Sequence, residues 1–459
     1  MMSDANRTMV ALRAIFLLAL SLLAMPAAAA EAAPPTLFVN VNVVPMDRER
    51  VLRGQSVLVR EGRIAAIAPK IAAPAGAVVV VDGGGTAYLL PGLSDMHVHV
   101  RDRETLAMLL ASGVTTALDM GEAHNAIVGR TRAAIARGDT PGPRLFAALA
   151  VDGSAQFGHL VLPTPEIARD AVRVAKANGY EFIKVYSNLT PEVFAALVIE
   201  ARAQGLAVVG HNVEKIGLER QVAGGQAMVA HLEEFLYGFF KLPEGADPQA
   251  APADSEIARA VAFLKQHGTT VTADLATYQA IAAQWGKPAA VQAALASPEA
   301  RHLSPGDRID WRRSGYQRRT GSLDARAAFL GRFARALAAA GVPLIAGTDA
   351  PTIAGLFAGD ALHRDLAALE AAGLSRYQAL ATATREPGAF VARALPPGER
   401  FGTVAVGSRA DLLLVTANPL DGLVALREPV GVMAAGRWHD AAALAAMREK
   451  VADTYVATP

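Results

Sequence analysis

Short apolar segments alternate with amphipathic segments of helical period through the middle of the chain. Runs of strand length lie at residues 114–119, 144–149, 182–186, 207–211, 227–231, 269–274 and 342–348, and an earlier one, at residues 86–90, precedes a Pro-Gly turn. Short apolar runs bounded by turn signals are typical of buried strands. The segments between them are long enough for helices, so the pattern predicts eight strands alternating with helices.

The helical segments carry their own start and stop signals. Two begin with a capping threonine followed by proline, and a glycine stands where each should end: Thr164-Pro165 with Gly179, and Thr190-Pro191 with Gly205. A further helix opens with the capping-box spacing of Ser375 and Gln378. Eight strand–helix alternations predict an α/β fold, a (β/α)₈ TIM-like barrel at residues 91–399, with a doubly wound α/β sheet as the weaker alternative.

A strand-like alternation of apolar and polar positions marks both ends of the chain. It is found in five segments, at residues 36–45, 55–60, 63–67, 407–415 and 430–438. Terminal segments can build one structure when the domain between them has nearby ends. We therefore predict a small β-sandwich assembled from residues 31–90 and 400–459.

One connection within the predicted barrel is unusually long. Residues 279–324 hold two tryptophans and a group of arginines: Trp285, Trp311, Arg301, Arg308, Arg312, Arg313, Arg318 and Arg319. A long insertion at the strand-end face of a barrel is commonly a lid or a binding loop. A solvated basic surface element is an equally good interpretation, because charge clusters usually are that.

The first thirty residues differ in character from the rest. Arg7 and Arg13 precede an apolar run at residues 14–25, and alanines follow up to Ala30. A basic start, a short apolar stretch and an Ala-x-Ala site are typical of a cleavable signal peptide, here residues 1–30. The run is shorter than the ~20 residues of a membrane span, so an uncleaved anchor is the weaker alternative. This predicts a periplasmic or secreted protein with no stable membrane span after cleavage near Ala30.

Composition narrows the chemistry further. The 459 residues are 52% hydrophobic and 19% charged, with a net charge of +1, so the chain resembles a packed globular protein without a nucleic-acid footprint. It has no cysteine, which excludes disulfides, thiolate ligands and a cysteine nucleophile. Any bound metal must therefore have nitrogen and oxygen ligands. Homo-oligomerisation is left open.

Four of the ten histidines stand at the ends of predicted barrel strands. His97 and His99 are two residues apart and share one face of a strand, while His211, His231 and Asp349 end the fifth, sixth and eighth strands. In a barrel of this type the active site lies at the C-terminal ends of the strands. A single His-x-His pair often arises by chance. Four histidines and an aspartate at the ends of barrel strands are a much more specific signal, and they predict a metal site.

Lys184 lies in the fourth predicted strand, on the same face as Phe182 and Tyr186. A bare ammonium facing an apolar barrel interior is costly. One resolution is a salt bridge to a nearby carboxylate. The other is a neutral amine that has reacted with carbon dioxide, giving a carbamate whose two oxygens can bridge two divalent ions. We favour the carbamate, because histidines and an aspartate converge on the same face.

These motifs together resemble a known family. The Pro-Gly-Leu-x-Asp-x-His-x-His opening at residues 91–99, the Gly-Thr-Asp at residues 347–349 and the returning segment at residues 402–412 are similar to those of the metal-dependent amidohydrolase superfamily. The resemblance is strongest to its binuclear branch, with bacterial Xaa-Pro dipeptidases (prolidases) and imidazolonepropionase-like amidohydrolases. It covers residues 36–440, including the flanking β-sandwich.

The resemblance implies a ligand set. His97, His99 and Asp349 would hold the more buried of two divalent ions, and His211 and His231 the more exposed one. Carbamylated Lys184 would bridge them. Zinc is the expected metal, and manganese, cobalt or iron have compatible ligand chemistry.

It also implies a mechanism. A hydroxide bridging the metals would be the nucleophile, and Asp349 would accept its proton and deliver it to the leaving nitrogen. Tyr186 is expected to stabilise the oxyanion, with barrel packing as its alternative role. His159 stands on a loop able to reach the substrate, with a solvated loop position as the alternative.

The implied activity is hydrolysis of an amide bond in a small-molecule substrate, a dipeptide or an N-acyl amino acid. A cyclic-amide or lactone hydrolase with the same site is the main alternative. A mononuclear deaminase is disfavoured by Lys184, and a catalytically silent solute-binding protein by the complete ligand set. A carboxylate on the substrate would need an arginine partner, for which the arginines of the insertion are candidates.

Overall fold

A computed structural model describes residues 33–242 and 244–456. The predicted signal peptide lies outside these residues. Within the described part of the chain, no helix is both long and apolar enough to cross a membrane.

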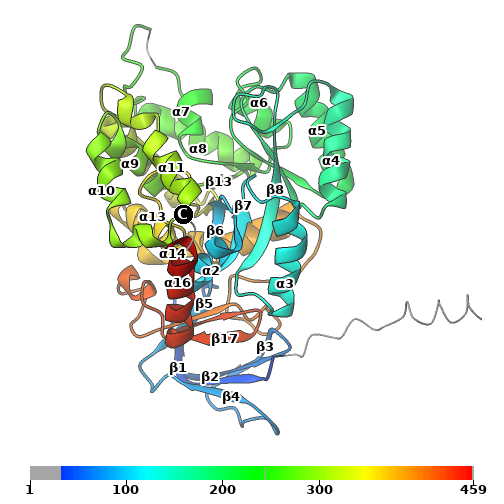
Figure 1. Cartoon of the computed structure of the whole chain (residues 1–459), viewed down its shortest axis with the longest axis vertical. Coiled ribbons are helices and arrows are strands. Elements are labelled where there is room, and N and C mark those ends of the chain that lie inside the picture. The colour runs from blue at the N-terminus through cyan, green and yellow to red at the C-terminus, as the bar shows by residue number, and fades with distance from the viewer. Residues whose placement is uncertain (1–32, 243, 457–459) are drawn as a thin grey trace, which may run out of the picture. The chain divides into compact units, whose positions relative to one another are not determined.

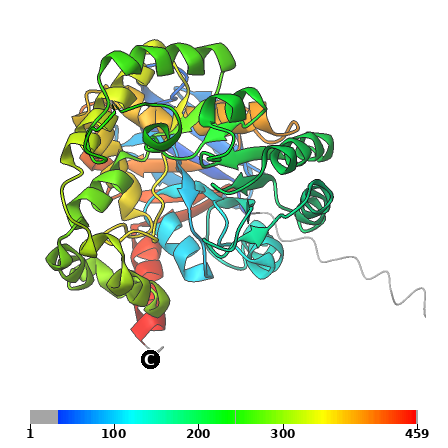
Figure 2. The ribbon, with the colours of Figure 1, turned by 90° about the horizontal axis from the view of Figure 1, so that it is seen from above.

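The central element is a ring of eight parallel strands. In order they are β6 (Leu93–Val98), β7 (Val114–Asp119), β8 (Arg144–Asp152), β10 (Phe182–Val185), β11 (Ala207–Gly210), β12 (Met228–Val229), β13 (Thr270–Thr272) and β14 (Leu344–Ile345). Each pairs with the next, and a parallel bridge between Val98 and Ala350 links the first strand to the segment after the last. The predicted (β/α)₈ barrel is therefore confirmed, and Figure 2 shows helices around the strands.

The first barrel strand differs from the prediction. The apolar run near residue 90 forms β5 (Tyr88–Pro91), which pairs with β1 (Thr36–Val43) and β15 (Leu412–Val415) in the other sheet. The chain crosses into the barrel at Gly92, where a Cβ would lie 2.2 Å from Thr115 Oγ1. Apolar character alone cannot tell which of two sheets a strand joins.

The barrel helices follow the predicted signals. They are α2 (Arg103–Ala111), α3 (Arg132–Arg137), α4 (Pro165–Ala177), α5 (Pro191–Gln204), α6 (Leu218–Ala223), α7 (Glu234–Gly238), α8 (Ser255–His267), α12 (Asp324–Ala340), α13 (Asp360–Ala371), α14 (Arg376–Thr382) and α15 (Arg385–Ala394). Thr164 and Thr190 accept N-cap hydrogen bonds. The capping box of Ser375 and Gln378 is complete. A π-helical turn, Ile127–Thr131, precedes α3.

The second sheet is built from both ends of the described chain, as predicted. Its strand order is β17-β16-β15-β5-β1-β2-β3, with β4 added to β1; the strands not yet given are β2 (Leu52–Arg60), β3 (Arg63–Ala68), β4 (Val79–Asp82), β16 (Gly431–Ala434) and β17 (Arg437–Asp440). Its inner side chains form a small core of their own, which includes Phe38, Val57, Leu89 and Leu412. A short 3₁₀ helix, Leu423–Leu426, lies between β15 and β16.

The residues after this sheet form a further helix, α16 (Ala441–Val456). It packs against α2, and the Tyr455 hydroxyl donates to Asp102 Oδ2 over 2.9 Å. Figure 1 shows it beside the barrel. The last residues of the described chain are thus tied to the helix that follows the first barrel strand.

The long insertion is helical. After α9 (Leu275–Gln284) come α10 (Pro288–Leu295), a 3₁₀ turn (Pro298–His302), α11 (Pro305–Arg313) and a second 3₁₀ turn (Tyr316–Arg318). The indole of Trp311 is buried and donates to Pro351 O over 2.6 Å. Arg308 donates to backbone carbonyls within the insertion, and Arg301 pairs with Glu449. Part of the arginine group is therefore structural, and the insertion packs against the loop that follows β14.

Strand β10 shows how the barrel positions the site. Phe182 belongs to the interior cluster, where its ring meets Phe146 edge-on at 6.3 Å between centroids. Ile183 and Val185 face outward into the core beneath the helices. Lys184 lies two residues after Phe182, on the same inward face and nearer the C-terminal end of the strand. Its amine therefore lies next to the apolar side chains of the barrel interior.

Candidate metal centre

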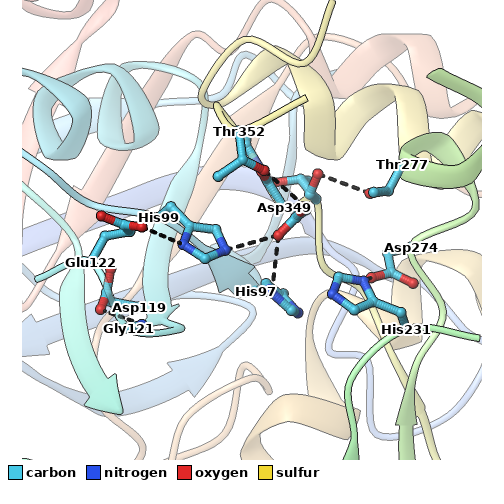
Figure 3. Close-up of polar contacts among 12 residues, drawn as sticks. His97, His99, Asp119, Gly121, Glu122, His231, Asp274, Thr277, Asp349 and Thr352 are labelled. Carbon is cyan, nitrogen blue, oxygen red and sulfur yellow. Dashed lines mark hydrogen bonds and ion pairs between the residues drawn. The ribbon is translucent and has the colours of Figure 1, made fainter. Parts of the chain in front are cut away.

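Three predicted ligands meet where β6 and the segment after β14 lie side by side. His99 Nε2 lies 2.8 Å and His97 Nε2 3.2 Å from the same oxygen, Asp349 Oδ1 (Figure 3). The backbone holds this arrangement, because the amides of Thr348 and Asp349 both donate to His97 O. The other carboxylate oxygen, Oδ2, accepts from the Thr352 hydroxyl over 2.8 Å. Two imidazole nitrogens and a carboxylate oxygen thus converge on one point.

Lys184 lies beside this group and is completely buried. Its Nζ is 3.2 Å from His97 Nε2 and 4.8 Å from the centre of the Tyr186 ring. Among the residues that the structure describes, no carboxylate oxygen lies within ion-pair distance of Nζ. The salt bridge considered from the sequence is therefore wrong. A buried, unpaired ammonium would be expensive, so this position calls for a neutral amine or for a different chemical form of the side chain.

His211 and His231 follow β11 and β12, and each faces a carboxylate through Nδ1. His231 Nδ1 hydrogen bonds Asp274 Oδ2, and His211 Nδ1 lies 3.0 Å from Glu234 Oε1. A histidine engaged in this way through Nδ1 offers Nε2 to a metal. His211 Nε2 is buried without a hydrogen-bond partner, which suits a nitrogen that serves as a metal ligand.

The four imidazoles form a continuous group. The ring centroids of His97 and His231 lie 4.2 Å apart, those of His211 and His231 5.1 Å, and those of His97 and His99 5.5 Å. The structure therefore brings together all six predicted ligands, which come from five different strand ends.

The electrostatics favour ligand forms of these side chains. Burial lowers the pKa of His97 and of His211 well below the usual value, so both rings are neutral. Burial alone would raise the pKa of Asp349, but contacts with His97 and His99 outweigh it and hold that pKa well below the usual range. Neutral imidazoles and an ionised carboxylate are the forms that bind divalent metals.

The carboxylates behind the histidines behave differently. Burial raises the pKa of Asp274 well above its usual value, and the nearby charge of Asp349 adds to the effect. Burial likewise raises the pKa of Glu233 to about 8 and that of Glu234 to about 7. Such perturbed carboxyl groups gathered at the strand ends of a barrel are characteristic of functional sites.

Backbone strain is concentrated at the same place. His231, Asp274 and Asp349 are non-glycine residues with positive φ, at 76°, 24° and 54°. Such conformations cost about 1–3 kcal/mol each and persist where the surrounding structure enforces them. These three residues stand at the ends of three neighbouring strands. Each keeps an unfavourable backbone conformation that directs its side chain into the site.

Tyr186 and His159 both reach the site. The Tyr186 ring stacks on the His211 ring at 4.4 Å between centroids, and the His159 ring lies 4.0 Å from that of Tyr186. His159 stands on the loop between β8 and the short strand β9 (Leu160–Val161), which pairs with β8. Tyr186 therefore lies between Lys184 and His159, in contact with the ring of His211.

Comparison with known proteins identifies the family. A model of the amidohydrolase family matches residues 88–439, well over half of the chain. The chain belongs to the amidohydrolase family. It is accordingly a hydrolase of carbon–nitrogen amide bonds.

Solved structures of similar fold are numerous. A structure described as bottromycin amidohydrolase has a TM-score of 0.71 and 25% identity, and the match covers 93% of this chain and 92% of that one. A protein described as a prolidase from Bifidobacterium longum has a TM-score of 0.65 and 23% identity, and the match covers 91% of this chain and 99% of that one. A Xaa-Pro dipeptidase with bound methionine has a TM-score of 0.64 and 19% identity, and the match covers 88% of this chain and 100% of that one. The search of curated protein sequences found no match.

Sequence reasoning missed several residues of this amidohydrolase site. Asp274 ends the seventh predicted strand and could have been found by the same strand-end rule that selected His211 and His231. Glu234 follows His231 by three residues, but no local pattern indicates that it faces His211. Glu122, 3.9 Å from His99 Nδ1, stands three residues beyond the end of β7.

The residues present fit divalent metal ions. Two groups have ligand atoms within 4.8 Å of one another, His97 with His99 and Asp349, and His97 with His231 and Asp274. The unpartnered Nε2 of His211 adjoins the second group. Nitrogen and oxygen donors of this kind suit zinc and its neighbours.

Proposed function

We propose that the chain is an exported, binuclear metal-dependent amidohydrolase that cleaves the amide bond of a dipeptide or an N-acyl amino acid. The observation that carries this proposal is Lys184: a fully buried amine, with no carboxylate partner in the described structure, set among the predicted metal ligands. A carbamate at this position would bring an anion between two metal ions, a role that a single-metal site does not have.

A carbamate on Lys184 would supply that anion. A neutral amine adds to carbon dioxide with formation of one N–C bond and loss of one proton. The product is a carboxylate-like group on an arm of suitable length, and its formation removes the cost of burying an unpaired ammonium. The carbamate would supply oxygen ligands to both ions. His97, His99 and Asp349 would hold one ion, and His211 and His231 the other.

Divalent ions bound there would lower the pKa of water and polarise the substrate carbonyl. The chain's own groups then handle protons and geometry. Asp349 is held ionised by its contacts with His97 and His99, so it can accept a proton from the attacking water and deliver it to the departing nitrogen. Thr352 donates to Asp349 Oδ2 and keeps the carboxylate in one orientation.

Tyr186 is placed to donate a hydrogen bond to the oxyanion that develops on the substrate carbonyl. Burial raises the pKa of its hydroxyl, so it remains protonated and able to donate. Burial lowers the pKa of His159, so its ring is neutral. We assign it to substrate contact from the loop above the site.

The choice of substrate rests on family relatives. Solved structures of similar fold include prolidases, one with a phosphonate derivative of proline and a Xaa-Pro dipeptidase with methionine in its active site. Others are molinate hydrolase and an ochratoxinase of A. niger, so proteins of this fold also act on other substrates. A cyclic-amide or lactone hydrolase using the same residues is the second candidate.

Metal content and hydrolysis, measured together, test the proposal. The native protein should hold two metal ions per chain and cleave members of a panel of Xaa-Pro and Xaa-charged dipeptides and N-acyl amino acids. The Lys184→Ala protein should do neither. Fewer than two ions in the fully metallated native protein, or full activity of the variant, would overturn the binuclear site. Two ions with hydrolysis of lactones or cyclic amides alone would overturn the substrate assignment.

Export is tested separately. The N-terminal sequence of the mature protein from a periplasmic or secreted fraction should begin at Glu31. An intact N-terminus on a cytoplasmic protein would overturn this part of the proposal.

A further inference from the structure

The side chain of Glu122 stands at the edge of the site, next to His99. Its Oε1 lies 3.9 Å from His99 Nδ1 (Figure 3). Its Oε2 lies 3.5 Å from Arg101 Nε. Neither contact is a hydrogen bond, and within the described residues the carboxylate of Glu122 accepts none. The side chain is 34% exposed. An ionised carboxylate has about four acceptor positions, so Glu122 offers them to a ligand.

The turn that presents Glu122 is rigid. Asp119, fully buried at the end of β7, accepts hydrogen bonds at Oδ2 from the amides of Gly121 and Ala123, both over 2.9 Å, and at Oδ1 from Val100 N over 2.7 Å. Gly121 has φ +119°, and a Cβ there would lie 2.5 Å from Ala150 Cβ. Only glycine fits at position 121. Through its contact with Val100, Asp119 also fixes the segment after His99. Glu122 is thus held at a set position relative to the site.

The charges around Glu122 favour a cation. Arg101 is already engaged, since its Nη1 donates to Asp307 Oδ1 over 2.8 Å and to Asp310 Oδ2 over 2.7 Å. With Glu122, three carboxylates surround one guanidinium. The three carboxylates outnumber the single guanidinium, and their negative charge attracts an ammonium.

Other unpartnered groups adjoin Glu122. His99 Nδ1 is buried without a hydrogen-bond partner and faces Glu122. His159, in the described structure, takes part in ring contacts but in no hydrogen bond. The two carboxylate oxygens of Glu122 provide acceptors for an ammonium, which has three donors.

We propose that Glu122 binds a protonated amino group of the substrate, an inference that rests on the proposed amidohydrolase function. The substrates are then aminoacyl compounds with a free amine, such as dipeptides, and N-acyl amino acids are excluded because acylation removes the charge. Glu122 acts as a specificity residue. It decides between two substrate classes that the metal site alone accepts equally.

A matched pair of substrates tests this inference. Leucyl-proline and N-acetyl-leucyl-proline share the scissile bond and differ at the amine. The metal-loaded native protein should cleave the free dipeptide with a kcat/KM at least about 30-fold higher. Glu122→Gln should lower kcat/KM for the free dipeptide about 10- to 100-fold, chiefly through KM, as expected for loss of a charged hydrogen bond. The acetylated substrate should change less than about 3-fold.

The control variant is Glu256→Gln. Glu256 is equally exposed, at 34%, and pairs with Arg259 on helix α8, so its loss should leave both substrates unaffected. Metal content is measured for each protein. If Glu122→Gln loses metal and slows both substrates equally, Glu122 orients His99 and the inference is wrong. Preference of the native protein for the acetylated substrate would also overturn it.

Failure of the underlying function gives a different result. A native protein with two metals that cleaves neither substrate would refute the dipeptidase proposal but leaves the amine site measurable. Calorimetry with L-leucinol, which has an amine and no amide bond, then decides. Binding by the native protein and about 10-fold weaker binding by Glu122→Gln support the amine site, and absence of binding by the native protein overturns it.

Discussion

His211 Nδ1 lies 3.0 Å from Glu234 Oε1, and the other oxygen of this carboxylate accepts a hydrogen bond from the Asn212 amide over 2.8 Å. Glu234 thereby holds both the ring of His211 and the backbone that follows it. Asp274 likewise orients the ring of His231, through a hydrogen bond between its Oδ2 and the ring Nδ1. Each histidine is oriented with Nε2 toward the site before any ion binds, and this reduces the ordering that metal binding must impose.

The first prediction concerns Glu234. Glu234→Ala should weaken binding of the more exposed metal ion about 10- to 100-fold, because the His211 ring loses its orienting partner. Glu234→Gln keeps an acceptor and should show a smaller loss. Competition with a chelator measures both affinities. Unchanged metal affinity in the alanine variant, with the fold intact, would show that the carboxylate does not orient His211.

The second prediction concerns Lys184 and uses a substitution that keeps the side-chain volume but removes the amine. Lys184→Met fills a similar volume with apolar atoms, so it should fold at least as stably as the metal-free native protein. It should nevertheless bind fewer than two metals and lose at least about 100-fold in kcat. Added short-chain carboxylates should partly restore the activity of Lys184→Ala, where a carboxylate can occupy the vacated space. No rescue, together with two bound metals in the methionine variant, would argue for a purely structural lysine.

Much of this site could be predicted from the sequence because barrel geometry converts sequence position into spatial position. His211, His231 and Asp349 are far apart in the chain, yet each follows a parallel strand, and the ends of parallel strands in a barrel meet at one face. Lys184 was found through the two-residue period of β10. These deductions needed only strand existence and direction, which are the most reliable features of an apolar pattern.

The features that were missed depend on information the pattern lacks. The run at residues 86–90 joined the terminal sheet, because burial is similar in either sheet and the glycine crossing at Gly92 is not visible in periodicity. Glu234 and Glu122 lie in loops, where side-chain direction follows from tertiary contacts. The arginines of the insertion looked equivalent in sequence, but Arg308 donates to local carbonyls and Arg301 to Glu449.

Gly347 provides a third prediction. A Cβ at this position would lie 2.6 Å from His97 Cβ and 2.5 Å from Thr272 Cγ2, so Gly347→Ala must displace His97 or the seventh strand. We expect a loss of about 1–3 kcal/mol in stability and a lower metal content. Gly331→Ala in helix α12 is the control, since the nearest atom to its Cβ would be at 3.5 Å and helix propensity favours alanine. A thermal melt and metal analysis compare the two, and equal behaviour would contradict the crowding argument.

The last prediction is remote from the metal site. His363 on helix α13 is buried, and its Nε2 lies 2.9 Å from Ser112 O, the carbonyl that follows helix α2. Burial lowers its pKa to about 4, although the contact with Ser112 opposes the shift. In the unfolded chain the same histidine has a pKa of about 6.5. Between these values the unfolded state binds a proton that the folded state does not.

Stability should therefore fall as the pH drops from about 6.5 toward 4, and it should be unaffected by His363 above that window. At pH 5 the loss attributable to His363 is about 2 kcal/mol relative to pH 7.5. His363→Gln cannot take up the proton, so the unfolding free energy of this variant, measured in urea, should fall by that much less over the same interval. Because release of bound metal at low pH affects both proteins alike, the difference between them isolates the histidine. Parallel pH profiles would mean that His363 is protonated in the folded protein or reaches solvent.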